Sequence, residues 1–518
     1  DKLFFIKMLS HTPNLLRNMV FRGCRFFSSS RFSSHVIGNE KQELAGQPTP
    51  QTHPHLMSDD HVTPGLPLSE FVRRRKELAN LLPAGCLAIV SAGHQKRFAH
   101  DIFYPFRTNT DFFYLTGVKE PESIMLLYKP PVSSDETGYN SGDESSSAET
   151  GSRPPRSHPV VKSNLYVRSR DPQKELWDGV RTGPERAQWM FGFDMAYPLS
   201  EFSHHVTRFA HEARTIFYPT GDEPLREMMH SLKTELNFAS ELRPIEGLVQ
   251  MHRIFKSDYE LDIHRQGADI SNTAFTRAIQ STKPGMTEHQ LQAILEFECK
   301  MRGATGLAYP PVVASGINAN TLHYVSNDMV MHDGELVLVD AGSEHNGYCT
   351  DITRTWPVNG KFSPAQAEVY QHVLRAQKLA IEAARPDDNR SLNSLQSIAV
   401  RSLVESMLEM GVLQGSVQEN CVSQAYITYY PHHVGHYLGL DVHDTAQVTS
   451  NLSFRPGMVI TIEPGIYLPN EPHIPEKYRG IGVRIEDNIV ITDGAPEVLT
   501  SATPKEIVDI ERLMENTQ

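Results

Sequence analysis

The C-terminal half of the chain contains four carboxylates and one imidazole, each inside or at the end of a strand-like apolar segment. These residues are Asp340, Asp351, His436, Glu463 and Glu486. Their segments read LVLVDAG (336–342), GYCTDITRTWP (347–357), HHVGHYLGLDVHD (432–444), VITIEPG (459–465) and GVRIEDN (482–488). Burying a carboxylate among apolar residues costs free energy unless it is paired or bound to a metal. We therefore expect these groups to bind cations, and their number indicates two divalent metal ions.

Two of the carboxylates flank a predicted β-hairpin. Asn346 and Gly347 lie between two strand-like runs, a sequence typical of a tight turn. Asp340 and Asp351 are nearly symmetric about this turn, so we expect them to oppose each other with Cβ atoms roughly 5 Å apart. Facing carboxylates repel unless positive charge lies between them. The alternative, a turn cap and a surface ion pair, leaves the other three segments unexplained.

The types of the candidate ligands narrow the choice of metal. Oxygen-rich sites with one imidazole favour Mn²⁺, with Co²⁺, Zn²⁺ or Fe²⁺ as alternatives. A structural zinc site would show cysteines at short spacing. The cysteines are instead scattered without a CxxC motif, at Cys24, Cys86, Cys299, Cys349 and Cys421. The HHVGH segment lacks the glutamate of HExxH, which argues against a zincin.

Length and charge limit the remaining possibilities. At 518 residues the chain is long enough for two domains with tails. A formal charge of −13 argues against nucleic-acid binding as its main role. No run of 18 apolar residues occurs, so we expect no transmembrane segment. Few, scattered cysteines are typical of a reducing compartment.

The N-terminal segment differs from the rest in composition. Between Lys2 and Asn39 there are six Lys and Arg residues and no Asp or Glu, with serines clustered around Arg31. This composition is typical of a mitochondrial transit peptide, which we predict for residues 1–39. A disordered basic tail is the alternative interpretation. The predicted location is mitochondrial, in the matrix or associated with the inner membrane.

The remaining chain divides by composition and periodicity. We predict an extended Pro-rich arm at 40–66, an α/β domain at 67–243 and a second domain at 244–518, which contains the candidate metal ligands. A Ser-, Gly- and acid-rich stretch at 131–162 predicts a disordered insertion in the first domain. Sheet segments are expected at 103–117 and 123–130. Helices are expected at 67–83, 258–281, 287–302, 364–385 and 391–411, three of them begun by the capping boxes Ser257/Glu260, Thr287/Gln290 and Ser363/Gln366.

The five acidic and histidine-containing segments, in this order, resemble the pita-bread metallopeptidases, which include aminopeptidase P, prolidase and methionine aminopeptidase. The segments YPFRTNTDFFYLTGVKEPES and RDPQKELWDGVRTG resemble the N-terminal domain of aminopeptidase P. This resemblance implies an α+β fold with a C-terminal pita-bread catalytic domain behind a smaller α/β domain. It also implies a homo-oligomer, a dimer or tetramer, in which Trp177 and Asp111 border a neighbour's pocket. The plainer alternatives are a core or interface role for Trp177 and a turn cap for Asp111.

By the same resemblance, Asp340 holds one metal, Asp351 and Glu486 bridge both, and His436 and Glu463 complete the other. Glu463 is then the candidate that accepts and relays a proton from the attacking water. The remaining candidates surround the substrate. His323, His432 and His443 could stabilise the oxyanion and bind substrate. Arg484 lies two residues before Glu486 and could orient the carboxylates and bind substrate, or form a simple buried ion pair.

The predicted function follows from these assignments. We predict a mitochondrial dinuclear metallo-aminopeptidase, like the intermediate-cleaving members of the family's mitochondrial branch. It would remove a single N-terminal residue from imported proteins after presequence cleavage. The main alternative is an Xaa-Pro aminopeptidase acting on short peptides. This stays open because Thr445-Ala446-Gln447 replaces a Val-Gly-Val-Tyr stretch of the bacterial enzymes. A prolidase and a metal-free peptide-binding protein are further alternatives.

Overall fold

The computed structural model describes residues 44–131, 161–236, 238–387 and 389–515. The predicted transit peptide and nearly all of the predicted insertion lie outside these residues. Strand β7 begins at Lys162, the last residue of the range predicted for the insertion. In the described part of the chain, no helix is long and apolar enough to cross a membrane.

The N-terminal domain is built on a mixed six-stranded sheet in the order β10-β9-β3-β6-β7-β8. The strands are β3 (Cys86–Ser91), β6 (Ile124–Lys129), β7 (Lys162–Val167), β8 (Met195–Pro198), β9 (Thr215–Tyr218) and β10 (Glu241–Pro244). The helices are α1 (Leu68–Leu81), α2 (Thr110–Thr116), α3 (Pro172–Asp178), α4 (Pro184–Met190), α5 (Phe202–Glu212) and α6 (Glu223–Leu236). Short hairpins form from β1 (His61–Thr63) with β2 (Leu66–Pro67) and from β4 (Arg97–Ala99) with β5 (Ile102–Phe103).

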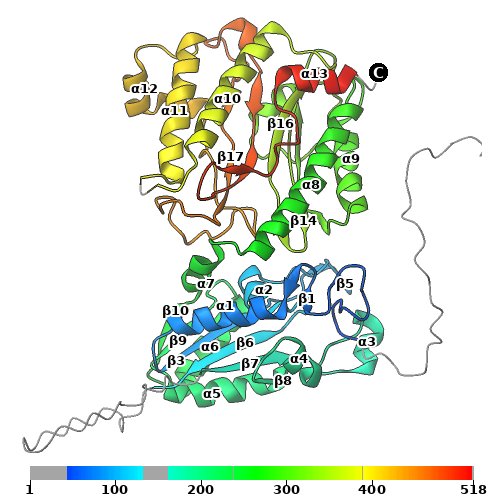
Figure 1. Ribbon diagram of the computed structural model, residues 1–518, viewed down its shortest axis with the longest axis vertical. Helices are drawn as coiled ribbons and strands as arrows, with labels where there is room; N and C mark the ends of the chain where they lie inside the picture. The colour runs from blue at the N-terminus through cyan, green and yellow to red at the C-terminus, as the bar shows by residue number, and fades with distance from the viewer. Residues whose placement is uncertain (1–43, 132–160, 237, 388, 516–518) are drawn as a thin grey trace, which may run out of the picture. The chain divides into compact units, whose positions relative to one another are not determined.

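Alternate residues of the central strand β3 pack against different helices. Leu87 and Ile89 belong to the cluster that contains Phe202 of α5. Ala88 lies in the cluster that contains Phe71 of α1. Because successive side chains of a strand point to opposite faces, helices cover both faces of this sheet, with α1 and α5 on opposite sides (Figure 1).

Two predictions for this region are wrong in detail. The aromatic run at 110–116, expected as sheet, is helix α2. The side chain of Asn109 accepts a hydrogen bond from the Phe112 backbone N–H, and Gly117 ends the helix with a left-handed φ of 71°. These caps outweigh the β preference of the aromatic residues. The described part of the predicted extended arm is also folded onto the domain, where Gln47 donates to the carbonyls of Val62 and Gly117.

The catalytic domain follows helix α7 (Glu246–Arg253). Its helices are α8 (Asp258–Ser281), α9 (Glu288–Met301), α10 (Pro364–Ala383), α11 (Leu392–Glu409), α12 (Val417–Ser423) and α13 (Ile507–Glu515). The expected boundaries of the four long helices are confirmed within a few residues. All three expected capping boxes are present, since Glu260, Gln290 and Gln366 exchange hydrogen bonds with their N-cap residues.

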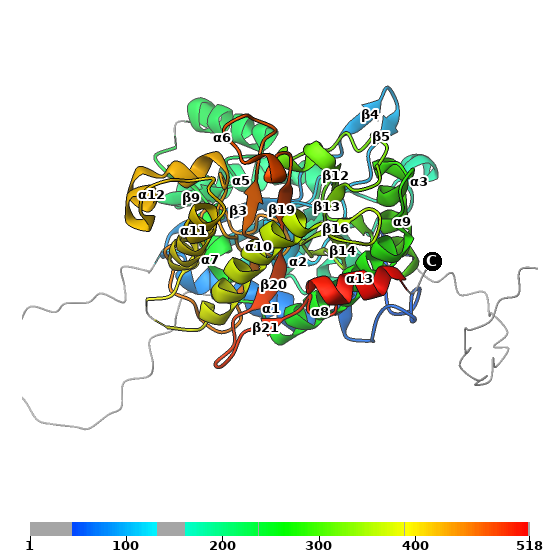
Figure 2. The ribbon, with the colours of Figure 1, turned by 90° about the horizontal axis from the view of Figure 1, so that it is seen from above.

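Every strand pair of this domain is antiparallel, as expected for an α+β domain, in the part of the chain that the structure describes. The strands are β11 (Gly306–Leu307), β12 (Val312–Ser315), β13 (Leu336–Ala341), β14 (Ser343–His345), β15 (Tyr348–Cys349), β16 (Ile352–Pro357), β17 (Val459–Ile462), β18 (Gly465–Tyr467), β19 (Gly482–Arg484), β20 (Asp487–Val490) and β21 (Glu497–Val498). In Figures 1 and 2, α8, α9 and α13 group on one side and α10 and α11 on the other.

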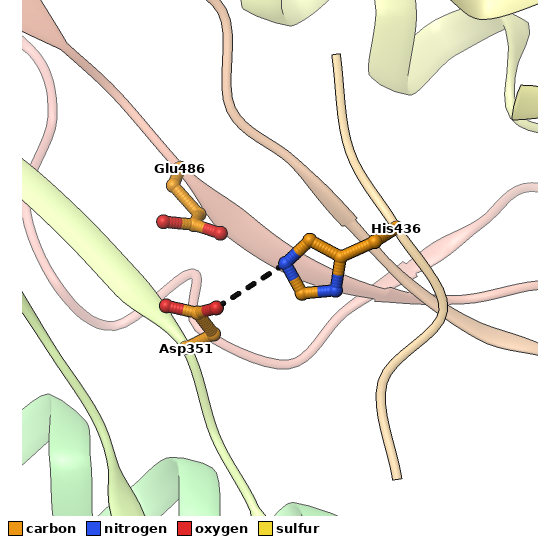
Figure 3. A group of neighbouring side chains, drawn as sticks. All are labelled: Asp351, His436 and Glu486. Carbon is orange, nitrogen blue, oxygen red and sulfur yellow. Dashed lines mark ion pairs between the residues drawn. The ribbon is translucent and has the colours of Figure 1, made fainter. Parts of the chain in front are cut away.

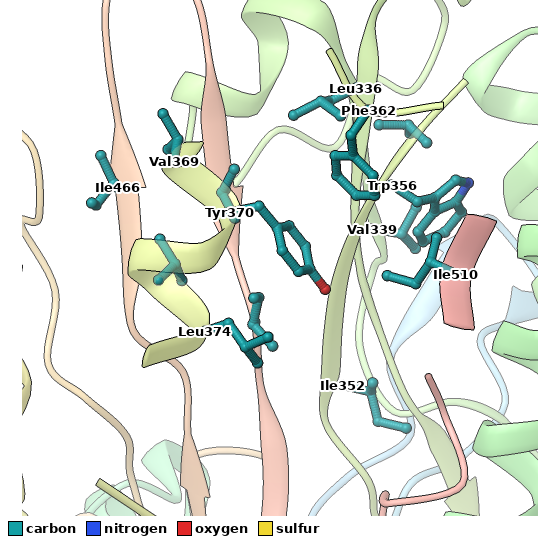
Figure 4. Packing of buried hydrophobic residues seen from close by; sticks show 14 of the residues in the cluster. Leu336, Val339, Ile352, Trp356, Phe362, Val369, Tyr370, Leu374, Ile466 and Ile510 are labelled. Carbon is teal, nitrogen blue, oxygen red and sulfur yellow. The ribbon is translucent and has the colours of Figure 1, made fainter. Parts of the chain in front are cut away.

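The strands that carry the candidate ligands separate an apolar core from a polar face. Val339 of β13, Trp356 of β16, Tyr370 of α10 and Ile510 of α13 pack together in the core (Figure 4). Asp340 is the neighbour of Val339 in β13 and therefore points to the opposite face. The alternation along the strand thus fixes which side chains reach the site.

A buried ionic cluster lies next to one candidate ligand. Asp487 and Arg354 are both fully buried, and Arg354 Nη2 lies 2.7 Å from Asp487 Oδ1. Lys505 Nζ lies 2.5 Å from Asp487 Oδ2. Although burial acts in the opposite direction, Arg354 and Lys505 hold the pKa of Asp487 well below its ordinary value. The folded protein therefore strongly favours the ionised carboxylate.

The Asp487→Asn variant should lose about 3–5 kcal/mol of unfolding free energy at pH 7, because Arg354 would keep its charge without its buried partner. Since the folded-state pKa of Asp487 is depressed, its contribution is present above the unfolded pKa of about 3.9 and is lost as the pH falls below it. Urea unfolding of the chelator-treated proteins at pH 7 and pH 3 measures both effects. A stability difference that does not shrink toward pH 3 would contradict this assignment.

Candidate active site

The nine residues predicted for the site all line one cavity of about 970 Å³. They are Asp340, Asp351, His436, Glu463, Glu486, His323, His432, His443 and Arg484. The carboxylates come from strand ends: Asp340 from β13, Asp351 from just before β16, Glu463 from just after β17 and Glu486 from just before β20. Segments far apart in the sequence therefore converge as predicted.

The hairpin brings its two aspartates together, but not in direct opposition. His345 pairs with Tyr348 around Asn346 and Gly347, as expected. In the continuing ladder, the partner of Asp340 is Thr353, not Asp351. The prediction of direct opposition is therefore wrong by two residues. Because side chains alternate with a period of two, this offset keeps both aspartates on one face as diagonal neighbours.

Three of the candidate ligands form a compact group. One ligand atom each from Asp351, His436 and Glu486 lies within 4.8 Å of the others, and the three side chains point toward one another (Figure 3). His436 Nε2 lies 3.4 Å from Asp351 Oδ2 and 3.5 Å from Glu463 Oε1. The fourth candidate ligand, Glu463, thus adjoins the group at the imidazole.

The imidazole of His436 is oriented for ligation through Nε2. Its Nδ1 lies 3.0 Å from the Tyr437 carbonyl, so Nδ1–H donates to that oxygen. This hydrogen bond leaves the Nε2 lone pair facing the carboxylates, an arrangement common among metal-binding histidines. With Nδ1–H committed to the Tyr437 carbonyl, Nε2 is the nitrogen of His436 that a metal could use as a ligand.

The pKa values of three candidate ligands are raised, so each of them binds a proton more readily than it would in water. Burial and the charge of Asp351 raise the pKa of Glu486 well above its ordinary value. Burial, with the charge of Asp351, likewise raises the pKa of Glu463 to about 7. Although burial acts in the opposite direction, hydrogen bonding to Asp351 and the charge of Glu463 raise the pKa of His436 to about 9. These shifts reflect negative charges crowded into a poorly hydrated space.

The donor set fits a divalent cation. Glu486 is 1% exposed, and its Oε2 accepts from Thr353 Oγ1 at 2.6 Å. Its other oxygen, Oε1, has no hydrogen-bond partner among the described residues. A buried carboxylate oxygen without a partner is costly. A cation held between Glu486, Asp351 and His436 would satisfy that oxygen and relieve the carboxylate repulsion.

The fifth predicted ligand, Asp340, is held by two other side chains. Arg484 Nη2 donates to Asp340 Oδ2 at 2.5 Å. Tyr309 Oη–H lies 2.6 Å from Asp340 Oδ1 and also contacts Asp351 Oδ1. Arg484 therefore forms a buried ion pair with Asp340, and its predicted role in orienting the carboxylates stays a prediction. Tyr309 had not been predicted, although its place before β12, which pairs with β13, is readable from the sequence.

The predicted catalytic histidines occupy different surroundings. Both nitrogens of His432 are engaged: Nδ1 lies 2.8 Å from the His433 carbonyl, and Nε2 lies 2.8 Å from Tyr467 Oη. Arg484 Nη1 donates to the same Tyr467 oxygen at 2.8 Å. Burial and the charge of Arg484 lower the pKa of His432 to about 3. His432 is therefore neutral and supports Tyr467, a second residue that the sequence reasoning missed.

His323 and His443 are the more accessible of the three. His323 lies in the loop after the 3₁₀ turn Gly316–Asn320 and is exposed at the cavity. The ring of His443 lies 4.3 Å from that of His436 between centroids. Burial and the charge of His436 lower the pKa of His443. Both rings border the space above the carboxylates.

The fold and the site together define a metallopeptidase. The model of metallopeptidase family M24 matches residues 262–493, and that of the aminopeptidase P N-terminal domain matches residues 71–218. Xaa-Pro aminopeptidase 3 from Homo sapiens is 37% identical over 508 residues, 95% of each chain. The chain belongs to the aminopeptidase P family of M24 metallopeptidases, as its sequence segments had indicated.

Two further relatives agree with this placement. The mitochondrial intermediate cleaving peptidase 55 from Arabidopsis thaliana is 34% identical over 506 residues, which cover 97% of this chain and 93% of the relative. The structure of Escherichia coli aminopeptidase P with the inhibitor Pro-Leu has a TM-score of 0.78 at 34% identity. The superposition covers 87% of this chain and 99% of that chain.

The Tyr309→Phe variant should bind Mn²⁺ about 10–100-fold more weakly, because Asp340 and Asp351 would lose the hydroxyl that orients them. Titration of metal-free protein, followed by calorimetry, measures this affinity. Metal uptake should also release protons, so affinity in both proteins should fall as the pH is lowered. Unchanged affinity in Tyr309→Phe, with Tyr259→Phe as an exposed control, would contradict the orienting role.

Proposed function

We propose that this protein is a mitochondrial dinuclear metallo-aminopeptidase that removes single N-terminal residues from imported proteins. The observation that carries the catalytic part is the convergence of Asp351, His436 and Glu486 within 4.8 Å, beside two further carboxylates in one cavity. The mitochondrial part rests on the basic composition of residues 2–39, which contain no Asp or Glu, and on similarity to a relative named as a mitochondrial intermediate cleaving peptidase.

We assign two divalent cations, Mn²⁺ first, to the five predicted ligands. Asp340 would hold one cation, Asp351 and Glu486 would bridge both, and His436 and Glu463 would complete the second. When bound, such cations lower the pKa of a water molecule and polarise the scissile carbonyl. Oxygen donors with a single imidazole match the preference of Mn²⁺.

Glu463 would accept and relay the proton of the attacking water. Its Oε1 faces His436 Nε2 at 3.5 Å, whereas Oε2 lies on the side of His432, 3.9 Å from Nδ1. One oxygen can thus serve as a ligand while the other accepts a proton from the attacking water. The proton would then pass to the leaving amine.

The histidines and Arg484 would bind the substrate's carbonyl and polar groups. His323 and His443 border the cavity with ring atoms available for donation to the developing oxyanion. His432 would act by fixing Tyr467, whose hydroxyl lies between His432 and Arg484. The proposed hydrogen-bond donors to the substrate are therefore His323 and His443, together with the Tyr467 hydroxyl.

The alternative function is an Xaa-Pro aminopeptidase acting on short peptides. The relatives named Xaa-Pro aminopeptidase 3, at 37% identity, favour it. The two functions share the metal centre and differ in whether proline is required after the first residue. The residues after His443, Thr445 and Ala446, line the cavity and are where substrate selection would differ.

The Asp351→Asn variant should lose more than about 100-fold in kcat, since losing the cations removes several kcal/mol of transition-state stabilisation. Its metal content should fall in parallel. Asp509→Asn, an exposed aspartate paired with Arg512, is the matched control and should keep both. Full peptidase activity in Asp351→Asn would refute the assigned centre.

Substrate profiling separates the two functions. Peptides of about ten residues, varied at the first and second positions, should be cleaved after the first residue without a requirement for proline. Mitochondrial proteins from cells lacking the active protein should retain one additional N-terminal residue at non-proline sites. Cleavage of Xaa-Pro peptides alone would favour the alternative, and cleavage restricted to dipeptides would indicate a prolidase.

A further inference from the structure

The loop at residues 437–445 carries His443 and directly follows His436; we call it the histidine loop. Its start is tied to the sheet, because the Leu438 N–H donates to the Val459 carbonyl at 3.0 Å. The two ends of the loop are hydrogen-bonded to each other, because the Asp444 N–H donates to the Tyr437 carbonyl at 2.9 Å. His443 directly precedes Asp444 and therefore lies next to this hydrogen bond.

The Asp444 carboxylate fills the inside of this loop. Any side chain at Gly439 would collide with it, so the close approach requires glycine. Asp444 is 4% exposed and forms ion pairs with two basic side chains. Arg253 Nη2 contacts Oδ1, and Lys256 Nζ lies 3.1 Å from Oδ2. These charges fix the carboxylate, and through it the loop.

Arg253 also reaches the N-terminal domain. Its Nη1 donates to Asp111 Oδ1 at 2.6 Å and to Thr110 Oγ1 at 2.9 Å, both at the start of α2. Its Nη2 donates to Asp441 Oδ2 in the histidine loop at 2.9 Å. Arg253 is 2% exposed. A single buried guanidinium thus joins α2 to the loop beside the metal ligands.

Two further contacts connect the same parts. Thr110 Oγ1 donates to Asp441 Oδ2 at 2.6 Å, and Arg107 Nη2 donates to the Leu440 carbonyl at 2.6 Å. Asp111 is not the turn cap considered from the sequence, since Asn109 caps α2. Its predicted place at a neighbour's pocket stays a prediction. The position of Trp177, 86% exposed on α3, leaves its predicted role at a neighbour's pocket a prediction.

The backbone directly after Asp444 is strained. Thr445 has a φ of 50°, in a region that β-branched residues rarely adopt, and is 2% exposed. Strain of this kind persists only where the surroundings enforce it, and it occurs often at functional sites. Here the enforcing contacts are those of Asp444, the preceding residue.

We propose that the N-terminal domain positions His443 for catalysis through this buried clamp, with Asp111, Arg253 and Asp444 as positioning residues. This inference rests on the proposed function for its kinetic readout alone. The clamp contains no metal ligand, so weakening it should leave the cations bound while misplacing the imidazole. A displacement of about 1 Å at a catalytic group can lower the rate by as much as 100-fold.

The test is a double-mutant cycle between Asp111→Asn and His443→Ala. Asparagine keeps the shape of the side chain and removes the charge that anchors Arg253. In the otherwise unchanged enzyme, Asp111→Asn should lower kcat about 5–20-fold, with KM and metal content within about twofold of the original. In the His443→Ala background the same change should lower kcat less than twofold, because residues that act through one group are not additive.

Two further variants serve as controls for this test. Arg265→Met removes an exposed arginine of α8 that pairs with Glu497 of β21 and should change neither kcat nor the cycle. Arg253→Lys keeps the charge but cannot bridge both sides, since lysine lacks the guanidinium fork. It should reproduce the effect of Asp111→Asn, and it replaces that variant if Asp111→Asn does not fold.

Hydrogen–deuterium exchange separates this inference from the proposed function. Amides of residues 436–448 should exchange faster in Asp111→Asn than in Arg265→Met, with or without peptidase activity. If the original protein cleaves no peptide, the proposed function fails and the exchange result still decides the clamp. Unchanged exchange in the loop, or equal kcat losses in both His443 backgrounds, would overturn the inference.

Discussion

Electrostatic repulsion among buried carboxylates is the constraint on which the catalytic domain depends. Asp351 and Glu486 are each nearly inaccessible, and one oxygen of Glu486 has no partner in the described part of the chain. Such a group is stable only with positive charge in its midst. Neighbouring side chains supply part of this positive charge, since Arg484 pairs with Asp340 and His436 with Asp351. Stability of the fold and binding of a metal thus both require positive charge among these carboxylates.

Much of this arrangement could be predicted from sequence, because local patterns carry it. The capping boxes at Ser257, Thr287 and Ser363 fixed the starts of three long helices, and the five acidic and histidine-containing segments identified the family. The predicted hairpin turn is confirmed. The predicted register is wrong, because symmetry about a turn gives the pairing of the strands only to within a residue or two, whereas the whole strand sets the pairing.

The residues that were missed act through long-range contacts. Tyr309 and Tyr467 become site residues only because the fold brings Asp340 and His432, distant in the sequence, to them. Helix α2 was mistaken for sheet because its aromatic residues favour strands, and the deciding caps, Asn109 and Gly117, were assigned to the same predicted sheet segment, 103–117. The histidine loop shows the same limit, since Arg253 links it to another domain.

Glu486 and Asp487 are consecutive, yet they serve opposite sides of the sheet. Glu486 faces the cavity, whereas Asp487 is enclosed with Arg354 in the interior. A single inserted or deleted residue before this pair would turn Glu486 toward the interior and Asp487 toward the cavity. The shorter side chain would then face the candidate site, and the longer one would enter a space already filled. A one-residue change in the register of this strand would therefore impair catalysis and folding together. This dipeptide therefore tolerates changes in its neighbours' identity far better than any change in spacing.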